Sequence, residues 1–345
     1  MKRKLKLVMM LTAVMLVKNV ALAQESFGTA VEYLTFIGEQ YEQLTDDQWS
    51  YTRAVANDKS ARKVENKRRN LLKTNKAAQL KISALPGFKG DTEYRDSVVS
   101  FLELNYNVLN EDYEKIMNME EIAEQSYDLM EAYLLAQEIA GKKISNASDM
   151  LSARHKKFAE ANNINLIEDS SKKSLKLKKA GLVYKYYNEI YLIFFKAYKQ
   201  EGYLMDAVTR GDVNGMEQSK NALLEYAQEG LDKLKDIKAF DADKSLKDAC
   251  IQTLKFYKEE AEDKSATIIN FYLKMEKFKS IQEAFNGKKE KNRTQEDVDQ
   301  FNTAVNDYNL ATNEYNTTNE YLNKTRAKAL KNWNTTAKKF TKKHI

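Results

Sequence analysis

Apolar side chains recur at helical spacing over two long stretches of this chain, residues 102–134 and residues 298–333. In both stretches the apolar residues are three, four or seven positions apart, which puts them on one stripe of an α-helix. At ~1.5 Å per residue, each helix would be roughly 50 Å long. The near-heptad spacing predicts long antiparallel helices that pack as in a coiled coil.

Little in the sequence interrupts a helix. The chain has one proline and 11 glycines, and no useful stretch alternates apolar and polar residues as a strand does. Residues 86–91 predict a turn that ends in Asp91, a residue that caps helices, and residues 211–215 predict a second turn. We therefore predict an all-α protein.

The chain divides into two related parts. Residues 162–179 are polar and lysine-rich and predict a linker between an N-terminal helical bundle (24–161) and a C-terminal one (180–345). Residues 71–105 match residues 223–257 at 7 of 35 positions, among them Phe88 with Phe240 and Asp91 with Asp243. This similarity predicts an internal repeat, with two bundles in tandem.

The first 23 residues have the features of a secretory signal peptide. A basic start (Lys2, Arg3, Lys4) precedes an apolar run at 7–17 and a small-x-small cleavage site that ends at Ala23. The run is too short to cross a membrane, which takes about 20 residues. We predict that this segment is cleaved, that the mature chain has no transmembrane segment, and that it is periplasmic or on the cell surface.

Cleavage changes the charge of the protein. The full chain has 56 basic and 50 acidic residues, and residues 1–23 hold five of the basic ones, so 51 and 50 remain. A net charge of +1 argues against nucleic acid as a partner. The only cysteine, Cys250, excludes an internal disulfide; we expect it to be a buried helical residue, with a surface thiol linking two chains as the alternative.

The sequence carries no motif for a metal, a cofactor or catalysis. Its two histidines, His155 and His344, are not in a Glu-x-x-His motif, and they cannot build a zinc site with one cysteine. Clustered acids, among them Glu120, Glu124 and Glu259, keep an envelope hydrolase open as an alternative. Such acids are usually a solvated helix face, so we predict a protein that is not an enzyme.

Aromatic residues form the most suggestive pattern in the chain. They step by three and four positions along one predicted helix: Tyr184, Tyr187, Tyr191, Phe194 and Tyr198. We call these five residues the aromatic stripe. It would suit a ligand pocket or a partner groove between helices, because tyrosine offers both an apolar ring and a hydroxyl. The alternative is a wide core helix.

The end of the chain is basic. It includes Lys331, Lys338, Lys339, Lys342 and Lys343, and no acid follows Glu320. These lysines could contact an anionic envelope polymer or lipid headgroup. They could equally serve only to favour the dipole of the last helix.

The chain resembles a family of exported, helical surface proteins of Gram-negative bacteria that has no assigned activity. Five stretches carry the resemblance: residues 62–69, 88–91, 108–133, 186–207 and 256–263. It implies export and an all-helical fold, and it supplies no functional residues. Taken together, we expect an exported, non-enzymatic scaffold or protein-interaction protein of the cell envelope. The alternative is a small-molecule or lipid-binding module that uses the aromatic stripe.

Overall fold

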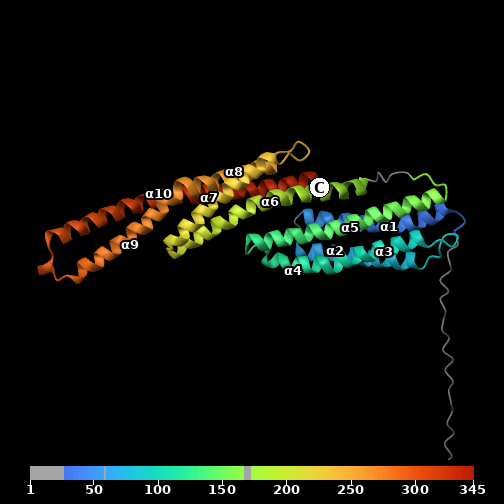
Figure 1. The fold of residues 1–345 in the computed structure, drawn as a ribbon, viewed down its shortest axis with the longest axis horizontal. Coiled ribbons are helices and arrows are strands. Elements are labelled where there is room, and N and C mark those ends of the chain that lie inside the picture. The colour runs from blue at the N-terminus through green and yellow to red at the C-terminus, as the bar shows by residue number, and fades with distance from the viewer. Residues whose placement is uncertain (1–26, 58–59, 167–171) are drawn as a thin grey trace, which may run out of the picture.

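The computed structural model describes residues 27–57, 60–166 and 172–345, shown in Figure 1. The predicted signal peptide lies outside these residues. The described chain is all-α, as predicted. Its only β contacts are two isolated bridges in turns, Phe88 with Asp91 and Phe240 with Asp243.

The first half is a bundle of long helices that pack on their neighbours in the chain. In order they are α1 (Ala30–Ala56), α2 (Ala61–Ser83), α3 (Glu93–Asn107), the π-helix η1 (Val108–Asp112), α4 (Tyr113–Ala123) and α5 (Tyr127–Ala161). The start of α1 is fixed by a capping box, in which Thr29 and Glu32 each accept a hydrogen bond from the other's backbone N–H. From its start, α5 returns along α4 and α3 and closes the bundle.

The second half repeats this order with longer helices. It comprises α6 (Lys172–Arg210), α7 (Val213–Asp236), α8 (Ser245–Glu259), the π-helix η2 (Glu260–Lys264), α9 (Ser265–Gly287), the 3-10 helix η3 (Glu290–Asn292) and α10 (Gln295–His344). The helix predicted over residues 298–333 is confirmed as part of α10. The predicted break near residue 211 is also confirmed, with Asp212 capping α7.

Two predicted boundaries are wrong. Residues 102–134 are not one helix, because the chain reverses between Ala123 and Tyr127, where the side chain of Ser126 accepts a hydrogen bond from the N–H of Leu129 and starts α5. This turn has no glycine or proline to announce it. The predicted linker is also too long, since α6 begins at Lys172 and residues 172–179 are helical.

Equivalent elements of the two halves lie at a constant spacing. Helix α8 begins 152 residues after α3 (245 minus 93), and η2 begins 152 residues after η1 (260 minus 108). Each half also contains a triad of aromatic rings. The ring centroids lie 5.6–5.9 Å apart in Tyr33, Phe88 and Phe158, and 5.5–5.8 Å apart in Tyr186, Phe240 and Phe340.

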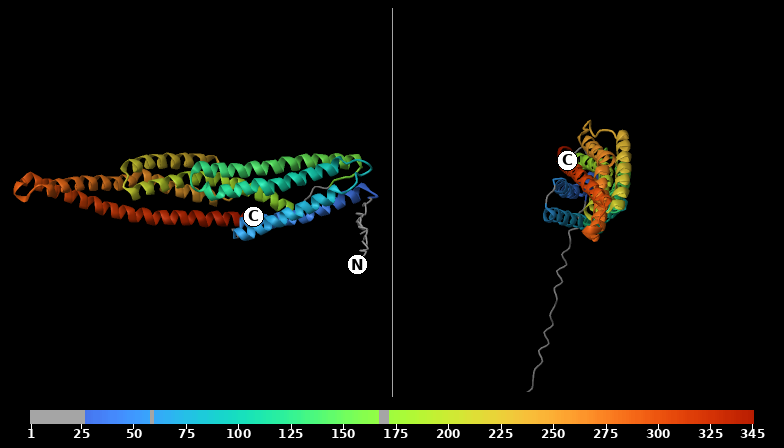
Figure 2. Two further views of the ribbon diagram at one scale, coloured as in Figure 1. Left: turned by 90° about the horizontal axis from the view of Figure 1, so that it is seen from below. Right: turned by 90° about the vertical axis from the view of Figure 1, so that its left-hand side faces the viewer.

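The halves lie along a common long axis and overlap where α5 and α1 pack on α6 (Figure 2). The bend between α4 and α5 reaches into the second half. Ala123, Met130 and Leu134 of this bend are buried in the core of the second half, and the Tyr203 hydroxyl of α6 donates to the carbonyl oxygen of Gln125 (3.4 Å). The two bundles therefore share apolar packing.

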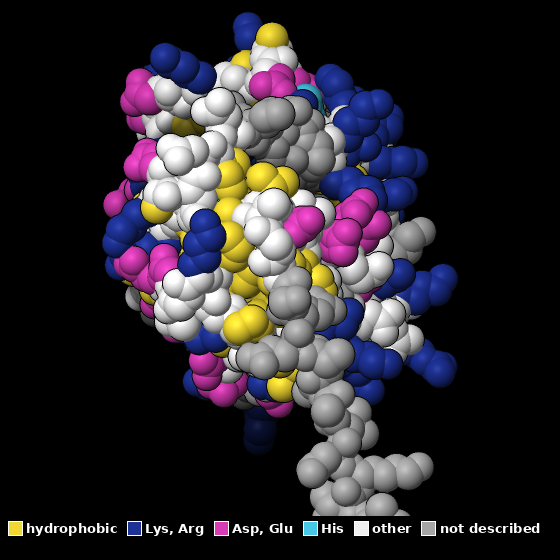
Figure 3. All heavy atoms as spheres, turned by 90° about the vertical axis from the view of Figure 1, so that its right-hand side faces the viewer, with side chains coloured by type: hydrophobic (Ala, Val, Ile, Leu, Met, Phe, Trp, Pro, Cys, Tyr) yellow, Lys and Arg dark blue, Asp and Glu magenta, His cyan; other side chains and the backbone are white. Residues whose placement is uncertain are grey.

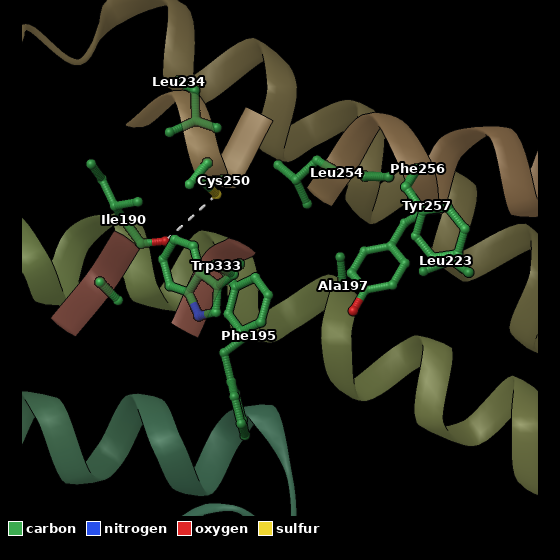
Figure 4. Close-up of a cluster of buried hydrophobic side chains, with 14 of the residues drawn as sticks. Ile190, Phe195, Ala197, Leu223, Leu234, Cys250, Leu254, Phe256, Tyr257 and Trp333 are labelled. Atoms are coloured by element: carbon green, nitrogen blue, oxygen red, sulfur yellow. Dashed lines mark hydrogen bonds between the residues drawn. The ribbon is translucent and has the colours of Figure 1, made fainter. Parts of the chain in front are cut away.

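The core of the second half is shown in Figure 4. Cys250 is fully buried there, with its Sγ 4.0 Å from the carbonyl oxygen of Ile190, which agrees with the expectation of a buried helical cysteine. Trp333 of α10 stacks on Phe194 of α6 with ring centroids 4.2 Å apart. Packing of this kind takes the place of disulfides in holding the fold together.

Helices α9 and α10 extend beyond the rest of the second half as a two-helix hairpin (Figure 1, far left). We call residues 273–314 the arm. Just before it, the Tyr272 hydroxyl donates to the carbonyl oxygen of Val208 (2.7 Å), which fixes α9 to the end of α6. The long overhang has no equivalent in the first half, because α4 has 11 residues and α9 has 23.

Candidate functional site

The aromatic stripe forms a continuous row of rings along α6. Tyr187 stacks on Tyr191 with centroids 5.7 Å apart, and Phe194 stacks on Tyr198 at 5.5 Å. Phe194 is buried and Tyr198 is 38% exposed, while the hydroxyl of Tyr184 is buried without a hydrogen-bond partner in the described part of the chain. Burial raises the pKa of Tyr184 to about 12, so its hydroxyl stays protonated at neutral pH.

A groove of about 730 Å³ opens beside a different set of aromatic residues, on another face of α6. Its aromatic walls are Tyr127, Tyr186, Tyr226 and Phe240, and no residue of the aromatic stripe lines it. Their sequence positions gave no sign of this groove, because its walls come from α5, α6, α7 and the turn after α7.

Lys196 lies at the centre of this groove. Its Nζ is 4.2 Å from the ring centroid of Tyr226 and 5.5 Å from that of Tyr127, and it forms an ion pair with Glu229 (2.7 Å). Aromatic faces attract cations. The site could therefore hold an aromatic or anionic small molecule against the Lys196 amine, while its cation-binding faces are already satisfied by Lys196.

The basic end of α10 is partly tied to the bundle. Lys343 pairs with Asp243 (2.8 Å), and the ring of His344 is 2.9 Å from the same carboxylate. The bond from Lys343 holds the pKa of Asp243 well below its usual range. Lys331, Lys338, Lys339 and Lys342 are exposed. Seen end-on from the side of the first half, lysine and arginine side chains gather most densely along one edge of the molecule (Figure 3).

A buried ionic cluster lies where the arm joins the bundle. Arg326 of α10 binds Glu201 of α6 through Nε and Glu260 of η2 through Nη2. Glu201 is 4% exposed and Glu260 is 0% exposed. Two carboxylates thus share one guanidinium in the interior, and both Oε2 of Glu260 and the hydroxyl of Tyr257 are buried without a hydrogen-bond partner in the described chain.

Burial dominates the protonation of this cluster. It raises the pKa of Glu260 to about 7, because the interior disfavours the charged carboxylate, while Arg326 acts in the opposite direction. Burial likewise raises the pKa of Glu201 and that of Tyr257. Sequence inspection missed the cluster, although Glu201 and Arg326 both interrupt apolar stripes of their helices.

The acids considered for hydrolysis are dispersed. Glu120 and Glu124 are exposed on or just after α4, whereas Glu259 on α8 accepts a hydrogen bond from the Tyr321 hydroxyl (2.7 Å). Over the described residues, no group of three or more His, Cys, Asp or Glu side chains is arranged to hold a metal ion. Within the same residues, every helix is too short or too polar to cross a bilayer.

The arm has an apolar seam that two helices cover only in part. Phe278 stacks on Tyr308 with centroids 5.0 Å apart and Phe285 stacks on Phe301 at 4.6 Å, but all four rings are half-buried. On the outside of the arm, Leu273 is 49% exposed and Leu310 is 65% exposed. Contiguous apolar surface of this kind marks interaction sites on soluble proteins.

A scan against protein-family models, a search of curated proteins and a search of solved structures each found no match to this chain.

Proposed function

We propose that this protein is an exported, non-enzymatic interaction protein of the cell envelope that binds a partner protein through its arm. The observation that carries the proposal is the half-covered seam of the arm. A helix normally buries its apolar stripe against other elements, and the arm offers only two helices for that purpose. A partner helix laid along the seam would bury the exposed parts of Phe278, Phe301 and Tyr308.

The signal-peptide features of residues 1–23 and the resemblance to exported surface proteins support an address outside the cytoplasm, in the periplasm or on the cell surface. N-terminal sequencing of protein recovered from fractionated cells tests this. We expect the mature chain to begin at Gln24. An intact start at Met1 in the cytosolic fraction would contradict export.

Duplication of one ancestral bundle is part of the same proposal. The constant spacing of α3 and α8, of η1 and η2, and of the two bridged turns supports it. A duplicated rod in which only the second copy extends its terminal hairpin suits a scaffold with one specialised end.

The binding test changes the outside of the arm and leaves its seam intact. Leu273→Glu with Leu310→Glu places charge where a partner would lie, so we expect capture of the partner by cross-linking in cells to fall at least tenfold. The matched control is Leu80→Glu with Met150→Glu, because these residues are 60% and 71% exposed outside the arm. Equal loss of capture in both double variants, or in neither, would refute binding by the arm.

A second function is favoured by the groove around Lys196, namely binding of a small molecule or lipid. Native mass spectrometry should then detect a ligand that co-purifies with the protein. We expect Tyr226→Leu to remove it, and Tyr187→Leu with Tyr191→Leu to retain it, since those tyrosines do not line the groove. Loss of ligand only in the second variant would instead favour the aromatic stripe as the site.

A further inference from the structure

The two halves carry different chemistry at one equivalent place. The spacing is 153 residues between Tyr33 and Tyr186, 152 between η1 and η2, and 182 between Phe158 and Phe340. By these spacings, the positions of Glu201, Glu260 and Arg326 correspond in the first half to Gln48, Val108 and Ile144. There, Val108 is 3% exposed and packs with Ala140 and Ile144 in a small apolar cluster.

An apolar cluster therefore suffices to pack this site. Replacing a buried ion pair by apolar residues is often neutral or stabilising, so stability alone does not account for the charged version. The charged version also lies at the base of the longer hairpin. Its three residues join α6, η2 and α10 where the arm begins, and we call this region the root of the arm.

The cluster is one positive charge short when both carboxylates are ionised. Arg326 neutralises one carboxylate, and an excess negative charge remains in the interior. The free atom is Oε2 of Glu260, which is buried and without a hydrogen-bond partner in the described residues. A proton on that oxygen would remove the excess charge and leave a neutral acid beside one ion pair.

We propose that Glu201, Arg326 and Glu260 form a proton-sensitive latch that sets how firmly the root of the arm is packed. With a proton on Glu260, the root packs as a neutral unit. Without it, the excess charge is relieved by local opening that brings water to Glu260. The inference rests on the proposed function only in that the latch would regulate the arm as a binding element.

No other charged group is placed to replace the proton. On α6 the cluster is faced by Glu201 and by the Tyr198 hydroxyl, and on α8 by the hydroxyl of Tyr257, which points toward α6 (Figure 4). On α7, which also packs against η2, the charged residues of the first turns, Glu217 and Lys220, pair with each other (2.5 Å). The remaining acids of η2, Glu262 and Asp263, are exposed.

The test measures hydrogen exchange of the full mature chain at about pH 5.5 and at about pH 8, with rates corrected for intrinsic exchange. The readout is the protection of η2 divided by that of η1, so that the apolar counterpart serves as an internal reference. We expect this ratio to fall at least tenfold at the higher pH in the wild type. An unchanged ratio would overturn the latch.

Two variants separate a latch from general instability. Glu260→Gln is neutral at every pH, so its ratio should stay constant and as high as that of the wild type at low pH. The triple variant Glu201→Gln, Glu260→Val, Arg326→Ile installs the residues of the first half, and its ratio should also be constant. If Glu260→Gln fails to fold, the triple variant decides. Persistence of the pH effect in a folded variant would overturn the proposal.

The outcome is independent of the test of arm binding. A constant wild-type ratio together with normal partner capture refutes the latch and retains the arm as a binding element. A pH-dependent ratio together with no arm-dependent capture supports the latch and refutes the proposed function.

Discussion

At the scale of single residues, the cluster around Glu260 has a measurable effect on stability. Its pKa of about 7 in the folded protein exceeds the ordinary value of 4.5, so between these pH values the folded state holds a proton that the unfolded state lacks. The free energy of unfolding should therefore fall as the pH rises through this window, by about 1.4 kcal/mol per pH unit and ~3 kcal/mol in total.

Urea denaturation at several pH values checks this prediction, with Glu260→Gln as the comparison. Asp243 contributes the opposite trend, because its lowered pKa gives stability that is lost as the pH falls. The difference between wild type and variant isolates Glu260. A difference that does not change with pH would contradict the raised pKa.

A second prediction at this scale concerns the two bridged turns. Each has two successive residues with positive φ, Lys89 and Gly90 in the first half and Asp241 and Ala242 in the second. Glycine adopts this backbone without strain and alanine does not. Ala242→Gly should raise the free energy of unfolding by about 1 kcal/mol, and Gly90→Ala should lower it by a similar amount. Thermal denaturation measures both, and the same sign for both variants would contradict the strain argument.

At the scale of helices, two glycines in helix interiors should respond oppositely to alanine. A Cβ on Gly38 of α1 would meet nothing within 4 Å, so the higher helix propensity of alanine should stabilise the protein by about 0.5–1 kcal/mol. On Gly230 of α7 it would lie 2.8 Å from Leu254 and 2.9 Å from Ile193. Overpacking costs about 1–3 kcal/mol, so Gly230→Ala should be destabilising.

Chemical denaturation of the two single variants tests this contrast. A stabilised Gly230→Ala variant would show that α7 shifts to accept the methyl group, and the close approach of α6, α7 and α8 would then not depend on this glycine.

The helices themselves were largely predictable, because their apolar stripes and the turns at residues 86–91 and 211–215 are local signals. The reversal before Tyr127 was not, since its only signal is the capping residue Ser126. The site was less predictable still. Glu201 and Arg326 meet across 125 positions, and the groove around Lys196 combines helices that no local pattern brings together.

At the scale of the whole molecule, the bend between α4 and α5 couples the two halves. Met130 is 4% exposed and belongs to the core of the second half. Met130→Ala should cost about 2–5 kcal/mol. It should also speed hydrogen exchange in α6 and α7, and the control Leu71→Ala, in the first-half core, should affect α1 and α2 first. Exchange limited to α5 in Met130→Ala would show that the halves unfold independently.

The burial of Cys250 gives the experimenter a sensor. Its surroundings raise the pKa of the thiol, so a water-soluble alkylating dye reacts only after α8 separates from α6. Labelling during denaturation thus reports on the second half alone. Val98, 152 positions earlier and equally buried, is the matching address in the first half. Moving the single sulfur there, by Val98→Cys with Cys250→Val, would let one dye time the opening of each half in turn.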